Sequence, residues 1–137
     1  FPGESEQEFQ ETKDFLSKVG FYEMHVFKYS RRKGTVAAEM DGQIPEGLKA
    51  RRSTELLALN EEMSRRYREM HLHKQAEILL EEEKEIGGGR YQVGFTREYI
   101  RAALPAESFP SGEEPAGRIV KGKLTGFLEP DILRICL

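Results

Sequence analysis

The hydrophobic pattern at the start of the chain is that of an amphipathic helix. Apolar side chains recur every three or four positions between residues 5 and 20, which places them on one helical face. Ser5, followed three residues later by Glu8, forms a capping-box motif, in which each side chain can accept a hydrogen bond from the other residue's backbone N–H. Gly20 can end the helix because glycine readily adopts the left-handed conformation. The pattern therefore predicts a helix from Ser5 to Val19.

The next segment, FYEMHVFKY at residues 21–29, is rich in aromatic and β-branched side chains and predicts a strand. A turn, a helix and a strand in this order are typical of the end of a βαβ unit. A single βα pair cannot cover both faces of its strand, so we expect residues 1–42 to be the remnant of a larger α/β domain. Such a remnant would expose the apolar face of its helix. It could be disordered, exchanged with another copy, or part of a dimer.

A second helical pattern begins in the segment DGQIPEGLKARR. Pro45 suits the first helical position, where its missing N–H costs nothing. An apolar stripe with helical spacing follows, formed by Leu48, Leu56, Leu59, Met63, Tyr67 and Met70. The pattern predicts a helix from about Pro45 to about Met70, roughly 40 Å long at 1.5 Å per residue. It is either a strut packed against one domain or a dimerising coiled coil, and we assign residues 43–73 to this connecting helix.

From residue 74 onward the hydrophobic period changes to two, which predicts strands. Five short segments carry the pattern: QAEILLEEEKEI, RYQVGFT, EYIRAAL, RIVKGKLTG and DILRICL. Gly-rich corners separate them, and residues 105–117 are rich in Pro, Gly and Ser and predict a loop. Short strands with tight corners suggest a small closed barrel, which removes exposed sheet edges. We assign residues 74–137 to a five-stranded, OB-like barrel and the whole chain to the α+β class.

Alternation assigns a face to the side chains of these strands. In the first strand Leu79 lies opposite to Ile78 and Leu80, and in the second strand Val93 and Phe95 share an apolar face. In the last strand the leucine and isoleucine at positions 133 and 135 are predicted to face inward, and the arginine between them outward.

The fourth predicted strand separates its cations from its apolar side chains. Lys121 and Lys123 point outward if Leu124 points into the barrel. The corner GFTREYIR contributes two more cations and an aromatic ring: Arg97, Arg101 and Tyr99. Exposed cations beside an aromatic ring suit an RNA-binding barrel, because cations hold the backbone and the ring stacks on an unpaired base. A buried Tyr99 with merely solvated lysines is the equally open alternative.

The composition narrows the choice of function. The 137 residues carry a net charge of −3, which argues against a strongly basic nucleic-acid-binding protein. The charges are separated, because residues 24–40 are mostly basic and residues 77–85 mostly acidic. We expect the acidic run at residues 81–85 to face solvent or to repel RNA from the wrong surface, and not to contact RNA. Cys136 is the only cysteine, so neither a disulfide framework nor a cysteine-based metal site can form within the chain. The three histidines are expected to be structural or surface residues. With no membrane-spanning run and no targeting signal, we expect a cytoplasmic protein that contacts no membrane.

Three blocks of the sequence together resemble the radical S-adenosylmethionine (SAM) tRNA methylthiotransferases over essentially the whole chain. FPGESEQEFQET is similar to a segment that follows a strand of the family's radical SAM barrel. HVFKYSRRKGTVAAEMDGQIPEGLKARRS resembles a late block made of a strand, Tyr-Ser, a basic turn, Gly-Thr and a Lys/Arg-rich helix. GFTREYIRA followed by GRIVKGKLTG resembles the TRAM domain, a small β-barrel associated with RNA binding.

Within this family, HVFKYSRR is most similar to the branch that acts on threonylcarbamoyladenosine. The resemblance implies conversion of adenosine 37 of tRNA, beside the anticodon, to its 2-methylthio derivative, with SAM and two 4Fe–4S clusters as cofactors. The isopentenyladenosine branch and a freestanding RNA-binding barrel without catalysis are the alternatives, and the ribosomal-protein branch is a poorer match. The family's three-cysteine motif is absent, so we expect a C-terminal piece of a longer enzyme. By itself the piece should hold no cofactor or metal, contain no catalytic residue and be inactive.

The resemblance also implies roles for individual residues. The C-terminal end of the predicted strand would line the adenine side of the SAM pocket through Phe27, Lys28 and Tyr29. The loop that follows would lie on the rim approached by a tRNA anticodon stem-loop, and its RNA-contacting residues are Arg31, Arg32, Lys33 and Thr35. The TRAM barrel would hold the tRNA from the other side, through Arg97, Arg101, Lys121 and Lys123 on phosphates and Tyr99 on a base.

Overall fold

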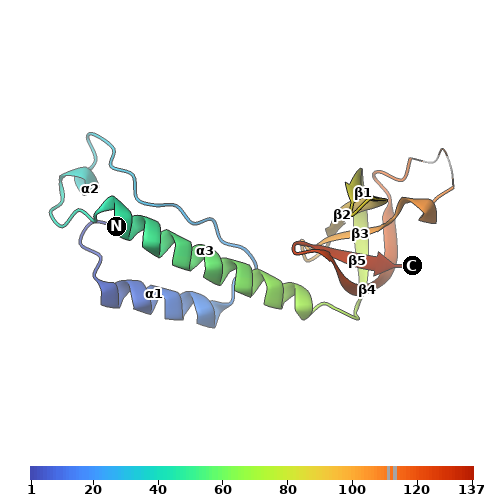
Figure 1. Ribbon diagram of the computed structural model, residues 1–137, viewed down its shortest axis with the longest axis horizontal. Coiled ribbons are helices and arrows are strands. Elements are labelled where there is room, and N and C mark those ends of the chain that lie inside the picture. The colour runs from blue at the N-terminus through green and yellow to red at the C-terminus, as the bar shows by residue number, and fades with distance from the viewer. Residues whose placement is uncertain (111, 113) are drawn as a thin grey trace. The chain divides into compact units, whose positions relative to one another are not determined.

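The chain forms two compact units, Phe1–Arg66 and Tyr67–Leu137, in a computed structural model that describes residues 1–110, 112 and 114–137 (Figure 1). The first unit is helical and the second is built from strands. The loop predicted at residues 105–117 includes positions 111 and 113, which lie outside the described residues. Part of the same stretch forms a short 3-10 helix, η1, at Ala106–Ser108.

Helix α1, Glu6–Val19, confirms the first predicted helix. The backbone N–H of Ser5 donates to Glu8 Oε2 at 2.7 Å, and the N–H of Glu8 donates to Ser5 Oγ at 3.2 Å, which completes the capping box. Gly20 ends the helix in the left-handed conformation, with a φ of 66°. The caps are encoded locally, so the sequence was sufficient to place both ends of this helix.

Helix α3, Glu46–Glu69, confirms the predicted long helix to within a residue at each end. It starts directly after Pro45, whose carbonyl accepts the N–H groups of Leu48 and Lys49 at 3.0 and 3.1 Å. A short helix between the two long ones, α2 at Val36–Glu39, has no counterpart among the predicted elements. Four residues are too few to produce a recognisable hydrophobic period.

The strand predicted at residues 21–29 is wrong, because this segment has no regular secondary structure. A strand requires backbone hydrogen bonds to a neighbouring strand. The first unit, as the structure describes it, contains no strand that could pair with this segment. Side chains of α3 bind the segment instead. The N–H of Met24 donates to Asn60 Oδ1 at 2.7 Å, and the Ser64 hydroxyl donates to the Tyr22 carbonyl. The expected βα remnant is therefore a set of helices with an irregular segment attached.

A buried arginine of α3 ties the start of the chain to this helix. Arg52 is 6% exposed and donates to Glu4 Oε2 at 2.7 Å and to Glu6 Oε2 at 3.2 Å. Its guanidinium also lies 5.0 Å from the centre of the Phe9 ring, which is itself 2% exposed. The two carboxylates and the ring offset the cost of burying the positive charge.

The described residues of the second unit form five strands: β1 Gln75–Ile86, β2 Gly89–Thr96, β3 Arg101–Pro105, β4 Ile119–Glu129 and β5 Ile132–Cys136. They form one mixed sheet in the order β1-β2-β3-β5-β4, in which only the β3–β5 pair is parallel. Pairing of β1 with β4 closes the sheet on itself. The number of predicted strands and the α+β class are therefore confirmed.

The barrel encloses a core of fully buried aliphatic side chains. The main cluster consists of Ile78, Leu80, Ile100, Ala102, Leu104, Leu124, Leu133 and Ile135. The predicted faces of β4 are confirmed, because Leu124 is 1% exposed whereas the Lys121 side chain is 76% exposed. The predicted faces of β5 are confirmed as well, with Arg134 exposed between two buried neighbours.

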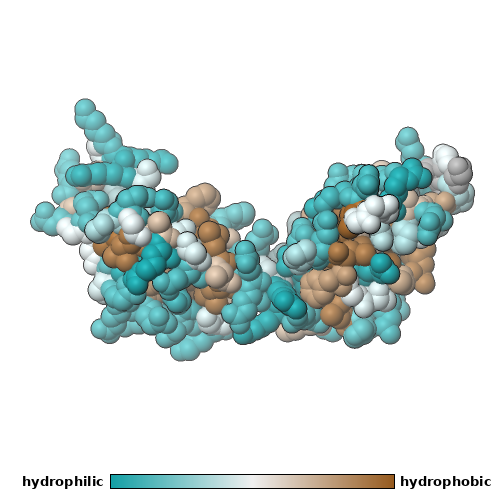
Figure 2. All heavy atoms as spheres, viewed as in Figure 1, coloured by the Kyte–Doolittle hydropathy of each residue, from teal (hydrophilic) through white to brown (hydrophobic). Residues whose placement is uncertain are grey.

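The apolar side of β2 does not line this main core. Val93 belongs to a second cluster and is 1% exposed, whereas Phe95, on the same face two residues later, is 36% exposed. The opposite face carries Gly94, where a Cβ would lie 1.8 Å from the Leu79 carbonyl oxygen. Val93 is buried by the other members of the second cluster, whereas Phe95 lies outside it. The cluster consists of Ile86, Val93, Ala103 and Ile132. Hydrophobic side chains are accordingly visible on the surface of both units (Figure 2).

Candidate nucleic-acid interface

One carboxylate on the outside of the barrel holds two of the predicted RNA-binding cations. Glu77 of β1 lies opposite Lys121 of β4 in the sheet register. Glu77 Oε1 is 2.8 Å from Lys121 Nζ, and Glu77 Oε2 is 2.5 Å from Arg97 Nη2. The hydrogen bond from Lys121 is the largest cause that holds the pKa of the Glu77 carboxyl below its usual range. Burial opposes it, and the charges of Arg97 and Lys121 lower the pKa further. The two cations are thus positioned side by side and partly neutralised.

The remaining two predicted phosphate contacts in the barrel differ in their surroundings. Arg101 is paired with Glu82 at 2.8 Å and lies 3.9 Å from Asp131, and its side chain is 26% exposed. Lys123 is exposed and has no ion pair with any residue that the structure describes. Of the two, Lys123 has the charge that is readily available to a phosphate.

Tyr99 lies at the surface of the corner between β2 and β3. It is 75% exposed, which rules out the interpretation of Tyr99 as a core residue. Its φ of 60° is unusual for a residue other than glycine. Thr96 anchors the corner, because its carbonyl accepts the Tyr99 N–H at 3.1 Å and its hydroxyl accepts the N–H groups of Glu98 and Ile100. A fixed corner with its ring in solvent can present that ring to a ligand.

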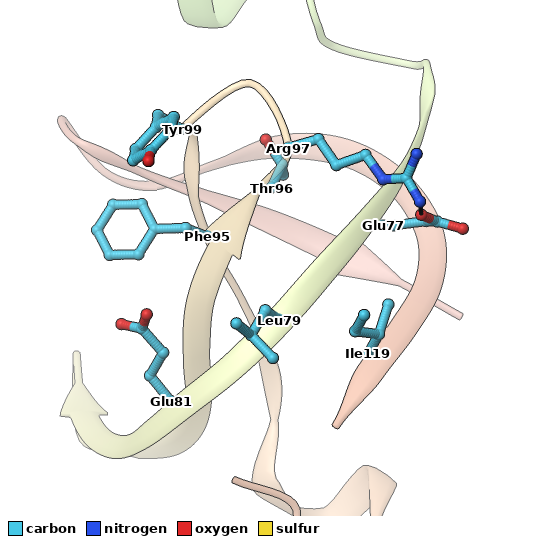
Figure 3. A pocket seen from close by; sticks show the side chains of 8 residues that line it. All are labelled: Glu77, Leu79, Glu81, Phe95, Thr96, Arg97, Tyr99 and Ile119. Carbon is cyan, nitrogen blue, oxygen red and sulfur yellow. Dashed lines mark ion pairs between the residues drawn. The ribbon is translucent and has the colours of Figure 1, made fainter. Parts of the chain in front are cut away.

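Beside Tyr99, the outer face of the barrel is hollowed, with a volume of about 470 Å³ (Figure 3). Leu79 forms its floor and pairs in register with Phe95 on one side and Ile119 on the other. The full lining is Glu77, Leu79, Glu81, Phe95, Thr96, Arg97, Tyr99 and Ile119. The sequence pattern assigned Leu79 to the outer face, but it did not identify the hollow, because this depends on the pairing of three strands.

Glu81 is exposed, as expected for the acidic run at residues 81–85, and it also lines the hollow. Its carboxylate lies at the hollow beside Phe95 (Figure 3). The register of β1 and β2 shifts between Leu80 and Glu82, so Glu81 is the extra residue of a bulge. Within the described residues it makes no ion pair or side-chain hydrogen bond, so both carboxylate oxygens remain available as acceptors.

The predicted rim of the first unit is built around α2. Arg31 donates from Nε to the Ala38 carbonyl at 2.7 Å, and the Thr35 hydroxyl donates to the Arg32 carbonyl at 2.8 Å. Arg31 and Thr35 therefore stabilise the loop itself. The side chains of Arg32 and Lys33 are exposed, with no ion pair inside the described part of the chain. Arg32 and Lys33 are therefore the cations of this loop that are available to bind a phosphate.

The segment predicted to line the SAM pocket borders a small hollow of about 160 Å³ in the first unit. Phe27 is 87% exposed, and Lys28 is paired with Glu46 at 2.5 Å. Tyr29 places its ring 5.5 Å from that of Phe1, and its hydroxyl is buried without a hydrogen-bond partner among the residues that the structure describes. The unpaired hydroxyl could bind a polar ligand atom. The hollow alone is too small for a whole cofactor, since such ligands occupy sites of about 300–1,000 Å³.

The described residues contain no group of three or more His, Cys, Asp or Glu side chains that could hold a metal ion. Cys136 is exposed, and it is the only thiol of the chain. Iron–sulfur clusters are held by several cysteine thiolates, so the residues of this chain do not fit such a cluster. In the part of the chain that the structure describes, no helix combines the length and the apolar character needed to cross a membrane.

Comparison with models of protein families finds no match. Comparison with curated proteins finds relatives that match nearly the whole chain. The threonylcarbamoyladenosine tRNA methylthiotransferase MtaB of Bacillus subtilis is 38% identical over 90% of this chain. The ribosomal protein uS12 methylthiotransferase RimO of Clostridium botulinum is 34% identical over 98%. The tRNA-2-methylthio-N(6)-dimethylallyladenosine synthase of Syntrophotalea carbinolica is 34% identical over 91%.

This chain spans less than a third of the length of these curated relatives, 27% to 30%. The resemblance to the methylthiotransferases is confirmed, and it involves their C-terminal region. The ribosomal-protein relative is as similar to this chain as the dimethylallyladenosine relative, and another RimO, of Pelotomaculum thermopropionicum, is 41% identical over 66% of this chain. The comparisons therefore do not bear out the expectation that the ribosomal-protein branch is a poorer match.

Proposed function

This chain is a homologue of the methylthiotransferases over their C-terminal region, and we propose that it is the tRNA-binding part of an enzyme that methylthiolates C2 of threonylcarbamoyladenosine 37. The identity of 38% with MtaB supports this branch. The dimethylallyladenosine relative supports the isopentenyladenosine branch as the alternative. A freestanding RNA-binding barrel remains the third candidate.

One observation carries the RNA-binding role: cations, an exposed aromatic ring and an apolar hollow share one outer face of the barrel. Arg97 lies at one edge of this face and Tyr99 at another (Figure 3). Lys121 is paired with Glu77, the same carboxylate that pairs with Arg97. The strand order, closed by β1–β4 and with a parallel β3–β5 pair, supports an OB-like barrel of the TRAM type. OB-like barrels bind oligonucleotides through cationic grooves and stacking side chains.

The first unit would supply part of the SAM pocket through Phe27, Lys28 and Tyr29, with Arg32 and Lys33 on the rim. Support comes from the buried, unpaired hydroxyl of Tyr29 beside a hollow. In the whole enzyme, SAM and two 4Fe–4S clusters would supply the radical chemistry. The clusters would be held by residues other than those of this chain, which has a single thiol.

The electrostatics predict weak and salt-dependent binding of the tRNA anticodon stem-loop. The chain has a net charge of −3, and Arg97, Arg101 and Lys121 are each paired with a carboxylate. Phosphates must therefore compete with these carboxylates for the cations. Each phosphate neutralised contributes roughly −0.7 to −0.9 to the slope of log K against log salt concentration, so a few contacts give a shallow slope.

The test is fluorescence anisotropy of a labelled anticodon stem-loop at several salt concentrations. Lys123→Glu should weaken binding several-fold and flatten the salt dependence, because it removes an unpaired cation from the proposed surface. Lys18→Glu is the matched control, since Lys18 is an exposed lysine of α1 outside that surface. No binding at low salt, or equal losses in both variants with the fold intact, would contradict the RNA-binding role.

The uS12 relative makes a ribosomal-protein substrate the second candidate. The same assay decides between the two when unlabelled uS12 is added as a competitor. If stoichiometric uS12 displaces the stem-loop and binds with a lower dissociation constant than the RNA does, the ribosomal-protein branch replaces the tRNA branch as the proposed function.

We also propose that the first unit self-associates. Its α1 side exposes apolar surface, with Phe15 62%, Val19 47% and Phe21 41% exposed. Exposed apolar patches of this kind mark interaction sites. Sedimentation velocity at several concentrations should detect a dimer that Phe15→Ser weakens. A monomer at all concentrations would contradict this proposal.

A further inference from the structure

The hollow on the outer barrel face has two aromatic walls and an acceptor, the Glu81 carboxylate, that pairs with no other described residue. In Figure 3 the Phe95 ring lies between the ring of Tyr99 and the carboxylate of Glu81, and all three line the same hollow. Leu79 and Ile119 extend its apolar surface. The ion pair of Arg97 with Glu77 lies at another edge. The volume of about 470 Å³ lies within the range of small-molecule sites.

We propose that this hollow binds an unpaired guanine base, stacked on Phe95 or Tyr99 with its Watson–Crick edge toward Glu81. The inference rests on the proposed RNA binding and adds a base preference to it. Aromatic side chains stack on any base, so Phe95 and Tyr99 alone would provide affinity without selectivity.

Glu81 supplies the selectivity because an ionised carboxylate accepts hydrogen bonds and donates none. The Watson–Crick edge of guanine carries two adjacent donors, N1–H and the exocyclic amino group, which match the two carboxylate oxygens. Uracil presents one N–H between two carbonyl oxygens, and those oxygens would face the negative charge. Adenine and cytosine each present one amino group beside an acceptor nitrogen. Guanine is therefore the base that pairs best with this carboxylate.

The charges along the hollow also orient the strand. The unpaired carboxylate of Glu81 repels phosphates, whereas Arg97 and Lys121 beside Glu77 attract them. A nucleotide that places its base toward Glu81 and its phosphate toward Arg97 therefore makes a favourable contact at each edge of the hollow. A basic peptide would instead be attracted to Glu81 and repelled at the Arg97 edge.

The test measures binding of the whole chain to three labelled oligonucleotides by fluorescence anisotropy at low salt. The first contains only uridine, the second has one central guanosine, and the third has inosine at that position, which lacks the exocyclic amino group. We expect the guanosine oligonucleotide to bind about fivefold or more tightly than the uridine one, with inosine in between, because a bidentate pair discriminates at this level.

Two variants separate the base contact from general charge effects. Glu81→Gln and Glu85→Gln each remove one negative charge from an exposed glutamate of β1 and should strengthen binding of the uridine oligonucleotide. Only Glu81→Gln should abolish the guanosine preference. Phe95→Ala should weaken binding of all three oligonucleotides several-fold.

The outcomes are distinguishable from failure of the proposed function. If the oligonucleotides bind but Glu81→Gln keeps the guanosine preference, or none exists in the original chain, the guanine site is wrong while RNA binding stands. If no oligonucleotide binds and a labelled Lys/Leu peptide does, the hollow serves a protein partner and both proposals are overturned.

Discussion

The two units of this chain are stabilised in different ways. The barrel unit contains eight fully or nearly fully buried residues in its main cluster, all aliphatic, and each is at most 1% exposed. In the helical unit the buried hydrophobic residues are Phe9, Ala38 and Met63, and a buried arginine lies against the first of them. The barrel thus has a core of its own, whereas the helical unit buries few hydrophobic side chains, has a buried arginine among them and leaves large apolar side chains in solvent.

This difference explains where sequence patterns succeeded. Strands of the barrel find partners within the same unit, so their alternation is realised as pairing and burial. The apolar segment at residues 21–29 has no strand to pair with among the described residues of its unit. Without a neighbouring strand its side chains are not buried in a sheet, and Phe27 is 87% exposed.

The largest expected effect is on the barrel core. Leu124→Ala should lower the free energy of unfolding by about 2–5 kcal/mol, because it leaves a cavity among closely packed aliphatic side chains. Urea denaturation followed by circular dichroism measures the change. Leu79→Ala is the matched control on the outer face, 44% exposed, and should cost much less. Equal losses for the two leucines would mean that the barrel does not depend on this core.

A smaller effect is expected in the helical unit. Arg52→Met should lower its stability by about 2 kcal/mol, because the change removes charged hydrogen bonds to Glu4 and Glu6 while keeping the aliphatic packing. Hydrogen exchange of α1 amides reports on this unit separately from the barrel. Arg51→Met serves as the control, since Arg51 makes exposed ion pairs with Glu6 and Glu55, and such pairs contribute little. If Arg52→Met leaves α1 exchange unchanged, the ion pairs are not what stabilises this unit.

The smallest expected effect concerns Glu77 and pH. Its pKa is lowered from the ordinary value of 4.5 in the folded state, mainly by the hydrogen bond from Lys121. A lowered pKa means that the ion pairs with Lys121 and Arg97 contribute stability above pH 4.5, and that this contribution is lost as pH falls through the folded value. Glu77→Gln should therefore be less stable than the original chain at pH 7 and equally stable in strong acid.

The same variant sharpens the RNA proposal. Removing the Glu77 charge frees Lys121 and Arg97 for phosphates, so binding at pH 7 should tighten and the salt slope should steepen by roughly 0.7–0.9 per added contact. Anisotropy titrations at two salt concentrations measure both quantities. Unchanged affinity and slope would show that these cations do not reach the RNA.

Part of the candidate site was predictable from the sequence. Alternation around Leu124 placed Lys121 on the outer face, and the corner sequence brought Arg97 and Tyr99 together. The partners of these cations were not predictable. Glu77 is 20 residues from Arg97 and 44 from Lys121 in the sequence, and they meet because β1 pairs with β4 and with β2.

The sequence by itself determined the elements whose causes are local: the capped helix α1, the helix α3 that starts after Pro45, and the alternating strands of the barrel. The tertiary structure decided whether residues 21–29 could become a strand, which side of β2 is covered, and where Glu81 points. Caps, helical periods and strand alternation depend on residues a few positions apart. Strand pairing, burial and ion pairing depend on segments that the chain brings together from far apart, and short-range patterns do not specify them.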